Sequence, residues 1–205
     1  MGNFEICVVG KKKLKRFAEN LTFDHVVQPS REELVEGFTL KGNWRSMHFK
    51  NENPLILELG CGKGEYTTGL ANKYPEKNFI GIDVKGARIW RGAKTAKEKD
   101  LDNASFLRIQ IEMLENCFAP GEVDEIWITF PDPHLKYRRA RKRLASQLFL
   151  ERYKKILKPE GKIHLKTDSA LLHGYTQGLL HGLKLPVLES THDLYKSQGL
   201  DEVKS

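Results

Sequence analysis

A glycine-rich turn between an apolar run and a helical pattern is the feature that most constrains the fold of this chain. Residues 57–64 read Leu-Glu-Leu-Gly-Cys-Gly-Lys-Gly, and the apolar run Leu55–Leu59 leads into them. Glu65–Ala71 then has the pattern of the start of a helix. Glycines at alternate positions let the backbone lie flat against a ligand, because a Cβ would occupy that space. The pattern predicts a strand, a ligand-binding turn and a helix.

A second predicted strand brings an acid beside this turn. Asn78–Ile82 is apolar and is followed directly by Asp83. That spacing is about the distance at which a βαβ unit places the carboxylate that binds a ribose. Glu58 stands at the end of the first strand. The amino half of the chain is therefore predicted to bind an adenosine-bearing cofactor.

The residues around the turn indicate which cofactor it is. A dinucleotide-binding turn has a glycine where the helix N-terminus receives a pyrophosphate, but this chain has the anionic Glu65 there. A phosphate loop is also absent, because Lys63 is followed by Gly64 rather than by Ser or Thr. A ligand with ribose, adenine and a positive charge but no phosphate fits better, and S-adenosylmethionine is such a ligand. Glu58 can face its ammonium group and Asp83 its ribose hydroxyls. A plain tight turn is the alternative.

The remaining pattern predicts an α/β fold. Strands are expected at Ser105–Ile109, Val123–Phe130 and Lys162–Thr167, and helices at Lys85–Lys99, Leu144–Leu157 and Ala170–Leu183. Pro159-Glu160-Gly161 is expected to stop the second of these helices. Strands that alternate with helices form a mostly parallel, doubly wound sheet covered on both faces. We expect one domain, preceded by an extension over residues 1–53 that is partly helical.

Basic residues are in modest excess and are unevenly distributed. Lys and Arg number 34 against 27 Asp and Glu, a net charge of +7. Lys11–Arg16 has five cations in six residues, and Lys136–Arg143 has six in eight. Such clusters are either solvated faces or phosphate-binding surfaces. Both interpretations stay open for the first cluster, and phosphate binding is favoured for the second.

Cysteine spacing and hydropathy exclude several classes of protein. Cys7, Cys61 and Cys117 are far apart, which predicts neither a disulfide framework nor a metal site. A catalytic thiol at Cys61 is disfavoured, because a small side chain under a cofactor explains that residue as well. No apolar run is long enough to cross a bilayer, and the first ten residues lack the order of a secretory signal. A cytoplasmic protein without a membrane partner is expected, as a monomer or a homodimer.

A proline-flanked acid follows the fourth predicted strand, in the sequence Pro131-Asp132-Pro133-His134. Ligands of open parallel sheets bind beyond the carboxyl ends of the strands, and the two prolines stiffen the segment. A rigid turn with a capping Asp is the structural alternative, but the acids already predicted at this edge favour a site. Asp168, after the fifth strand, is a weaker candidate, because a helix N-cap would explain it.

These segments together resemble the bacterial tRNA (guanine-N7-)-methyltransferase family over about residues 54–185. The resemblance rests on residues 57–64, Gly81-Ile82-Asp83, Phe130-Pro131-Asp132-Pro133, the basic run and Lys166-Thr167-Asp168. It implies a Rossmann-like class I methyltransferase domain at 54–205, short at its carboxyl end, with S-adenosylmethionine as the donor. It further implies guanosine 46 in the variable loop of tRNA as the acceptor, and no metal.

The resemblance also implies roles for single residues. Asp132 would be the catalytic residue, at the junction of cofactor and guanine. The cofactor would be bound by Glu58, Gly60, Gly62, Asp83, Gln110 and Asp132. The substrate would be bound by Lys136, Arg138, Arg139, Arg141, Lys142, Arg143 and Asp168. The chain departs from the family in having Gln110 where an acid is common and His134 where an aromatic residue is common. It also has no counterpart of the carboxyl-terminal T-x-Y-E segment, since it stops shortly after Leu194-Tyr195-Lys196.

Other functions remain as alternatives to this one. The first is a non-catalytic RNA-binding protein that retains the cofactor pocket. A methyltransferase for small molecules or proteins is disfavoured by the basic run beside the site, and a nicotinamide dehydrogenase by Glu65.

Overall fold

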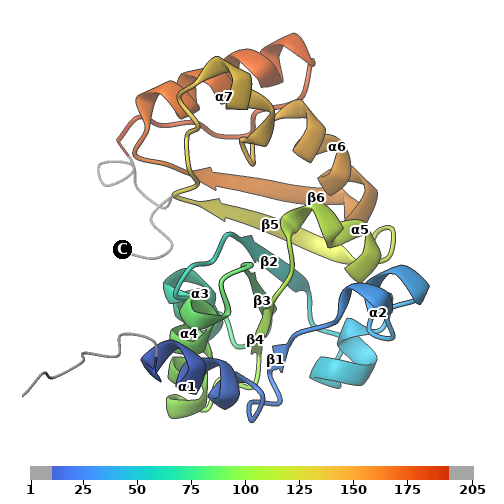
Figure 1. Cartoon of the computed structure of the whole chain (residues 1–205). Coiled ribbons are helices and arrows are strands. Elements are labelled where there is room, and N and C mark those ends of the chain that lie inside the picture. The colour runs from blue at the N-terminus through green and yellow to red at the C-terminus, as the bar shows by residue number, and fades with distance from the viewer. Residues whose placement is uncertain (1–10, 194–205) are drawn as a thin grey trace, which may run out of the picture.

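The computed structural model describes residues 11–193, and in this range the chain forms one parallel sheet between two helical layers (Figure 1). The predictions that concern residues 1–10 and 194–205 lie outside the described residues. The elements, in chain order, are α1 (Lys11–Asn20), β1 (Val26–Val27), α2 (Arg31–Glu36), η1 (Trp44–Phe49), β2 (Leu55–Leu59), α3 (Glu65–Lys73), β3 (Asn78–Ile82), α4 (Gly86–Glu98), β4 (Ala104–Leu107), η2 (Ile111–Met113), α5 (Leu114–Cys117), β5 (Val123–Thr129), η3 (Tyr137–Lys142), α6 (Gln147–Ile156), β6 (Leu157–Lys166) and α7 (Ala170–Gly182).

The sheet has six strands in the order β1-β4-β3-β2-β5-β6, and every neighbouring pair is parallel. The order reverses at β2, so the chain winds outward from the centre in both directions. The predicted α/β, doubly wound parallel sheet is therefore confirmed. Ligand sites in such sheets lie at the carboxyl edge near the point of reversal, which here is the edge after β2.

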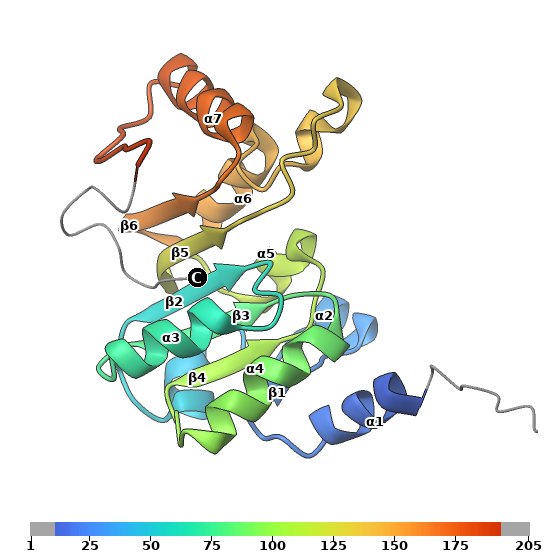
Figure 2. The ribbon, with the colours of Figure 1, turned by 90° about the vertical axis from the view of Figure 1, so that its left-hand side faces the viewer.

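Successive side chains of the central strand β2 point alternately into the two hydrophobic layers. Leu55, Leu57 and Leu59 face the layer formed by α2, η1, α5, α6 and α7. Ile56 faces the opposite layer of α3 and α4, and α1 packs on α4 rather than on the sheet (Figure 2). The central strands β2, β3 and β4 are covered on both faces and are buried throughout, whereas β6 at the sheet edge is only partly buried.

Several predicted element boundaries differ from the structure, and two of these differences have a clear physical cause. The strand predicted at Val123–Phe130 ends at Thr129, because Phe130 has a φ of 45° and leaves the strand conformation. The Pro-Glu-Gly sequence at 159–161 does not terminate the helix α6, contrary to the expectation from the sequence. The helix ends at Ile156, and the three residues belong to β6, where the pairing with β5 shifts register between Val123 and Glu125. An irregularity of this kind accommodates a proline within a strand.

The segment before residue 54 is part of the sheet and of the core. β1 adds a strand beside β4. Trp44 is fully buried, stacks on Phe118 with ring centroids 5.5 Å apart, and donates from Nε1 to the Cys117 carbonyl at 3.0 Å. These contacts join residues more than 70 positions apart in the sequence. Hydrophobic periodicity is a local pattern and does not reveal such contacts.

Replacement of Trp44 by alanine is predicted to destabilise the protein by about 3–5 kcal/mol, because it empties a buried aromatic site and removes a hydrogen bond. Val35→Ala on α2, where the side chain is 69% exposed, is the control and is expected to change the free energy of unfolding by less than about 0.5 kcal/mol. Urea unfolding measures both. A change of under about 1 kcal/mol for Trp44→Ala would contradict the assignment of this segment to the core.

Candidate active site

The glycine turn lies at the carboxyl edge of the sheet, between β2 and α3. Gly60, Gly62 and Gly64 have φ values of 74°, 58° and 73°, a region that other residues enter only with strain. The Gly60 N–H donates to the Ile82 carbonyl at 2.8 Å, which fixes the turn to the end of β3. A Cβ on Gly64 would lie 2.6 Å from the Phe106 ring, whereas one on Gly62 would approach no atom closer than 4.0 Å. Gly64 therefore serves packing, and Gly62 leaves open space for a ligand.

Glu58 is buried beneath this turn and joins three elements. Its Oε2 accepts from the Thr67 backbone N–H at 2.8 Å and from the Thr67 hydroxyl at 2.5 Å, and its Oε1 accepts from the Thr129 hydroxyl at 2.6 Å. Burial raises the pKa of Glu58 from its ordinary 4.5 to about 7, although the threonine hydrogen bonds oppose the shift. Since the residue is only 4% exposed, it fixes the position of the turn and offers a ligand little direct contact.

Asp83, at the end of β3, holds the other side of the turn. Its Oδ2 accepts from the Gly62 N–H at 3.0 Å and its Oδ1 from the Lys85 N–H at 2.8 Å. A carboxylate has about four acceptor positions, so both oxygens can still accept from the two hydroxyls of a ribose. Gln110 is exposed after β4 at the same edge of the sheet. The open glycine turn with an acid on either side fits S-adenosylmethionine.

Thiol and metal chemistry find little support at this edge. Cys61 is 5% exposed, and burial with the nearby carboxylates raises the pKa of its thiol well above the ordinary range. A thiol in such surroundings is a poor nucleophile. Among residues 11–193, no group of three or more His, Cys, Asp or Glu side chains could hold a metal ion.

Asp132 is presented on a strained loop that follows β5. Phe130 and His134 on either side have φ values of 45° and 42°, which bulky residues rarely adopt. The Oδ1 of Asp132 accepts from the His134 N–H at 2.9 Å, and its side chain is 71% exposed. Backbone strain of this kind persists only where the surroundings enforce it, and it concentrates at functional sites. The loop therefore holds an accessible carboxylate in a fixed position.

Arg143, one of the predicted substrate-binding cations, is buried against this loop. The residue is 6% exposed, so a phosphate has little access to it. Its Nε donates to the Pro133 carbonyl at 2.9 Å and its Nη2 to the His134 carbonyl at 3.2 Å, while the guanidinium lies 4.2 Å from the Tyr175 ring centroid. A planar guanidinium suits such paired contacts. Arg143 is thus a positioning residue for the Asp132 loop.

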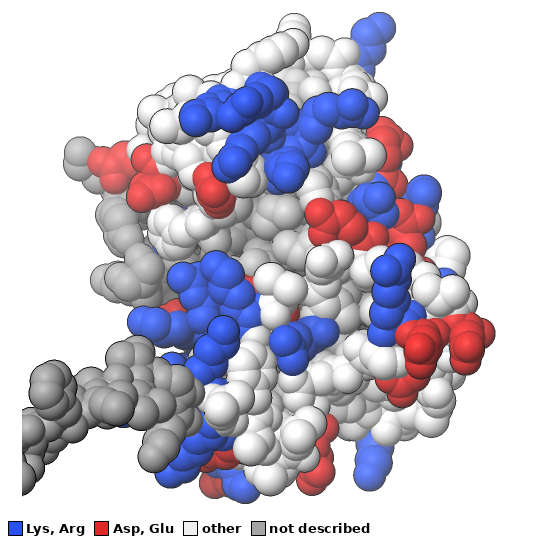
Figure 3. Space-filling view, viewed as in Figure 1, with Lys and Arg blue, Asp and Glu red and all other residues white. Residues whose placement is uncertain are grey.

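The other cations of the predicted cluster are exposed on and beside η3. They form no ion pair with any residue from 11 to 193. In the space-filling view, Lys and Arg gather over this element at the top of the molecule (Figure 3). The exposed members are Lys136, Arg138, Arg139, Arg141 and Lys142. The arrangement suits binding to a polyanion.

Asp168 is not the cap of the helix that follows it. The hydroxyl of Ser169 accepts from the Leu172 N–H at 3.3 Å, and Ser169 holds the N-cap position of α7. Asp168 stays exposed at the carboxyl edge after β6, so the structural alternative for this residue is wrong.

Sequence reasoning missed several side chains around the turn. Thr67 and Thr129 bind Glu58, and the Tyr66 ring meets the Phe130 ring edge-on with centroids 6.2 Å apart. The Lys166 Nζ lies 5.1 Å from the Tyr66 ring centroid. Each of these residues lies in or beside a segment already singled out, but single hydroxyls and rings carry no spacing signal of their own.

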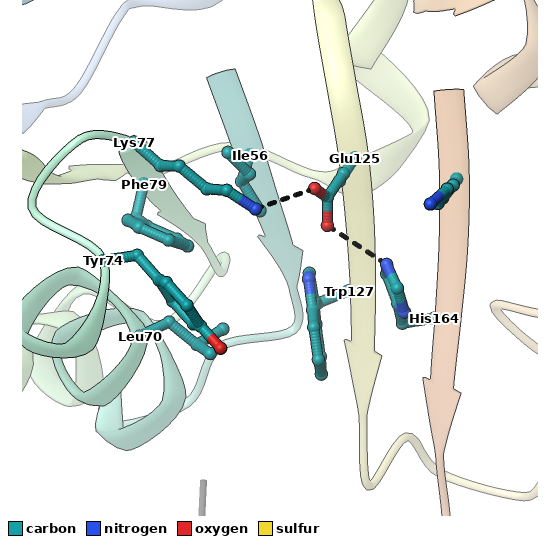
Figure 4. A pocket seen from close by; sticks show the side chains of 9 residues that line it. Ile56, Leu70, Tyr74, Lys77, Phe79, Glu125, Trp127 and His164 are labelled. Carbon is teal, nitrogen blue, oxygen red and sulfur yellow. Dashed lines mark hydrogen bonds and ion pairs between the residues drawn. The ribbon is translucent and has the colours of Figure 1, made fainter. Parts of the chain in front are cut away.

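A separate cavity of about 230 Å³ lies on the sheet face over β2, β5 and β6, toward the amino ends of the strands (Figure 4). Glu125 there accepts from Lys77 and from His164, each at 3.1 Å, and these contacts lower its pKa to about 2. Glu125 is therefore held between His164 and Lys77, and Lys162 also lines the cavity. None of the lining residues is a glycine, so the cavity has no open turn of the kind that follows β2.

Comparison with solved structures supports the assignment of the fold. The solved "Structure of an Antibiotic Related Methyltransferase" matches with a TM-score of 0.52 at 20% sequence identity, covering 72% of this chain and 69% of that one. A parallel doubly wound sheet with this strand reversal and this glycine turn is the Rossmann-like fold of class I methyltransferases, as predicted.

Sequence comparison defines the family. Residues 52–200 match the family model described as "Putative methyltransferase". The tRNA (guanine-N(7)-)-methyltransferase of Christiangramia forsetii is 60% identical over 92% of this chain and 84% of its own length. The enzyme of the same name from Bacteroides thetaiotaomicron is 47% identical over 96% and 78%. The chain belongs to the tRNA (guanine-N7-)-methyltransferase family.

The raised pKa of Glu58 predicts a pH-dependent stability. Between pH 4.5 and about 7 the folded protein holds a proton that the unfolded chain releases, so the free energy of unfolding falls as the pH rises. A shift of this size corresponds to about 3 kcal/mol. The stability of the wild type relative to Glu58→Gln should therefore decrease by up to that amount across this window. Urea unfolding at both ends tests this, and an unchanged difference would contradict it.

Arg143→Gln is predicted to loosen the Asp132 loop. Two hydrogen bonds from a charged donor, worth about 1.5–3 kcal/mol each, are weakened. Chymotrypsin cleavage after Tyr137, which is 94% exposed, should become at least about tenfold faster. The neighbouring exposed cation supplies the control, since Lys142→Gln should leave the rate at the wild-type value. Equal rates for both variants would show that Arg143 does not restrain the loop.

Proposed function

We propose that this protein transfers the methyl group of S-adenosylmethionine to N7 of a guanine in tRNA, with guanosine 46 of the variable loop as the acceptor. The observation that carries the proposal is the position of Asp132. β2 and β5 are neighbouring strands, with Leu59 opposite Ile128. The glycine turn after β2 and the Asp132 loop after β5 therefore leave the sheet side by side, with the cations of η3 next in the chain.

The acceptor atom decides what the protein must supply. N7 of guanine carries a free lone pair and no proton, so no general base is needed. S-adenosylmethionine, when bound, supplies an electrophilic methyl group on a sulfonium sulfur. The protein has to align the two reactants and exclude water, and positioning of this kind supplies a large part of the rate.

Asp132 would stabilise the positive charge that develops on the guanine base. The purine ring becomes positive as N7 takes the methyl group, so a fixed carboxylate beside it is worth more in the transition state than in the ground state. Arg143 keeps this carboxylate in place through Pro133 and His134. Asp83 would hold the ribose of the cofactor, Glu58 would favour its ammonium group, and Gln110 would lie near the adenine.

Basic side chains on η3 would bind tRNA phosphates, and their contribution would weaken as salt rises. Lys136, in the same connection as Asp132, and Asp168, after the neighbouring strand β6, would contact the substrate. The proposal includes a cytoplasmic location, where bacterial tRNA is found. Within residues 11–193, no helix combines the length and apolarity needed to span a bilayer.

Incubation with labelled S-adenosylmethionine and unmodified tRNA tests the proposal. Label recovered as N7-methylguanosine, and lost when guanosine 46 is replaced, is the expected result. Binding of both cofactor and tRNA without any label would instead support the non-catalytic RNA-binding alternative.

Asp132→Asn is predicted to lower the transfer rate at least about 100-fold, because it removes the negative charge while keeping the shape of the side chain. Single-turnover rates with tRNA and labelled cofactor measure the effect, and binding of both ligands should persist. Asp102→Asn, an exposed acid at the opposite edge of the sheet, is the control and should keep the wild-type rate. A rate within a few-fold of wild type for Asp132→Asn would remove this residue from the mechanism.

A further inference from the structure

A second concentration of positive charge lies on α1 and α4, outside the site described so far. α1 carries five Lys and Arg against one acid, and α4 carries four against one. The net charge of the whole chain is +7. Together with the η3 cluster, these two helices therefore hold more positive charge than the entire protein does on balance.

Specific contacts hold α1 against α4, so its cations are not on a loose tail. Asn20, fully buried, donates from Nδ2 to the Gly86 carbonyl at 2.8 Å. The Trp90 indole donates to Glu19 at 2.7 Å, and the Arg16 guanidinium lies 4.6 Å from the Trp90 ring centroid. α1 thus lies in a fixed position beside the amino-terminal half of α4, and its Lys12, Lys13 and Lys15 are exposed there.

Four of these cations lack acidic partners among the described residues, as the exposed cations of η3 do. Lys12, Lys15, Arg88 and Arg91 are exposed and form no ion pair with any described residue. On the opposite helical layer, by contrast, Arg152 and Lys155 of α6 both pair with Glu115 of α5. Repulsion among uncompensated cations works against the folded state, and a polyanion would relieve it.

The α1–α4 surface and η3 lie on opposite sides of the glycine turn. In the sheet order, β3 and β4 are on one side of β2, and β5 and β6 are on the other. α1 and the η3 loop project from the same edge of the sheet, below and above the turn respectively (Figure 2). A depression of about 300 Å³ between α1 and α4 is lined by Arg16, Lys63, Arg88 and Arg91, with Glu65 as its one acid.

We propose that the exposed cations of α1 and α4 form a second phosphate-binding surface for tRNA, which holds the RNA backbone on the side of the active site opposite to η3. This inference rests on the proposed function. A base that enters a pocket leaves phosphates on both of its flanks. Contacts on one flank alone would let the RNA pivot about η3, whereas contacts on both flanks fix the direction from which the guanine approaches.

Two double variants test the surface: Lys12→Gln with Lys15→Gln on α1, and Arg88→Gln with Arg91→Gln on α4. Binding of a tRNA transcript is measured by fluorescence anisotropy at several salt concentrations. Each variant should weaken tRNA binding roughly tenfold and should reduce the slope of log affinity against log salt by about 1.5, since each phosphate contact contributes about 0.7–0.9. The dissociation constant for S-adenosylmethionine, measured by calorimetry, should stay at its wild-type value.

The control removes the same number of charges far from the site. Lys154→Gln with Lys184→Gln alters exposed lysines near the amino ends of the strands, and tRNA affinity should stay within twofold of wild type. If the wild type methylates tRNA but both test variants keep its affinity and salt slope, this inference is overturned and the proposed function stands. A wild type that neither binds nor methylates tRNA overturns both. Equal losses in the test and control variants would show a nonspecific charge effect and would also overturn the inference.

Discussion

The carboxylate of Glu58 is the contact on which the geometry of the active site depends. It receives donors from Thr67 at the start of α3 and from Thr129 near the end of β5. Through a single buried side chain, the strand that precedes the glycine turn is joined to the helix that follows it and to the strand that carries the Asp132 loop. Asp83 completes the arrangement by bonding the Gly62 N–H. Two acids therefore fix the backbone around the open space above Gly62.

Short-range patterns predicted the centre of this structure well. The glycine turn, the strands Leu55–Leu59 and Asn78–Ile82, and Asp83 are local features, and a parallel sheet brings the ends of its strands to one edge. Long-range packing was beyond such patterns. The burial of Trp44 depends on Cys117 and Phe118, and β1 is only two residues long. Neither feature has a periodicity that a sequence can display.

The basic run shows where composition misleads. Six cations in eight residues predict one phosphate-binding cluster, yet the structure turns Arg143 inward, to the Pro133 and His134 carbonyls, and leaves the others exposed. A charge count does not record which side of a backbone a side chain takes. The same holds for Asp168, where the capping hydroxyl belongs to the adjacent Ser169. The role of each polar residue depends on the direction in which its own side chain points. A sequence pattern does not distinguish this direction between neighbouring residues.

The hydrogen bonds from Arg143 to the Pro133 and His134 carbonyls close residues 133–143 into a loop. Residues within this loop can change in number or in kind without moving its two ends, because lengthening a closed loop adds little entropic penalty. The carboxylate of Asp132 lies next to the closed ends of the loop, whereas η3 forms its far side, here called the rim. If the protein works as proposed above, changes at the rim would alter its contact with RNA and leave the position of Asp132 unaltered.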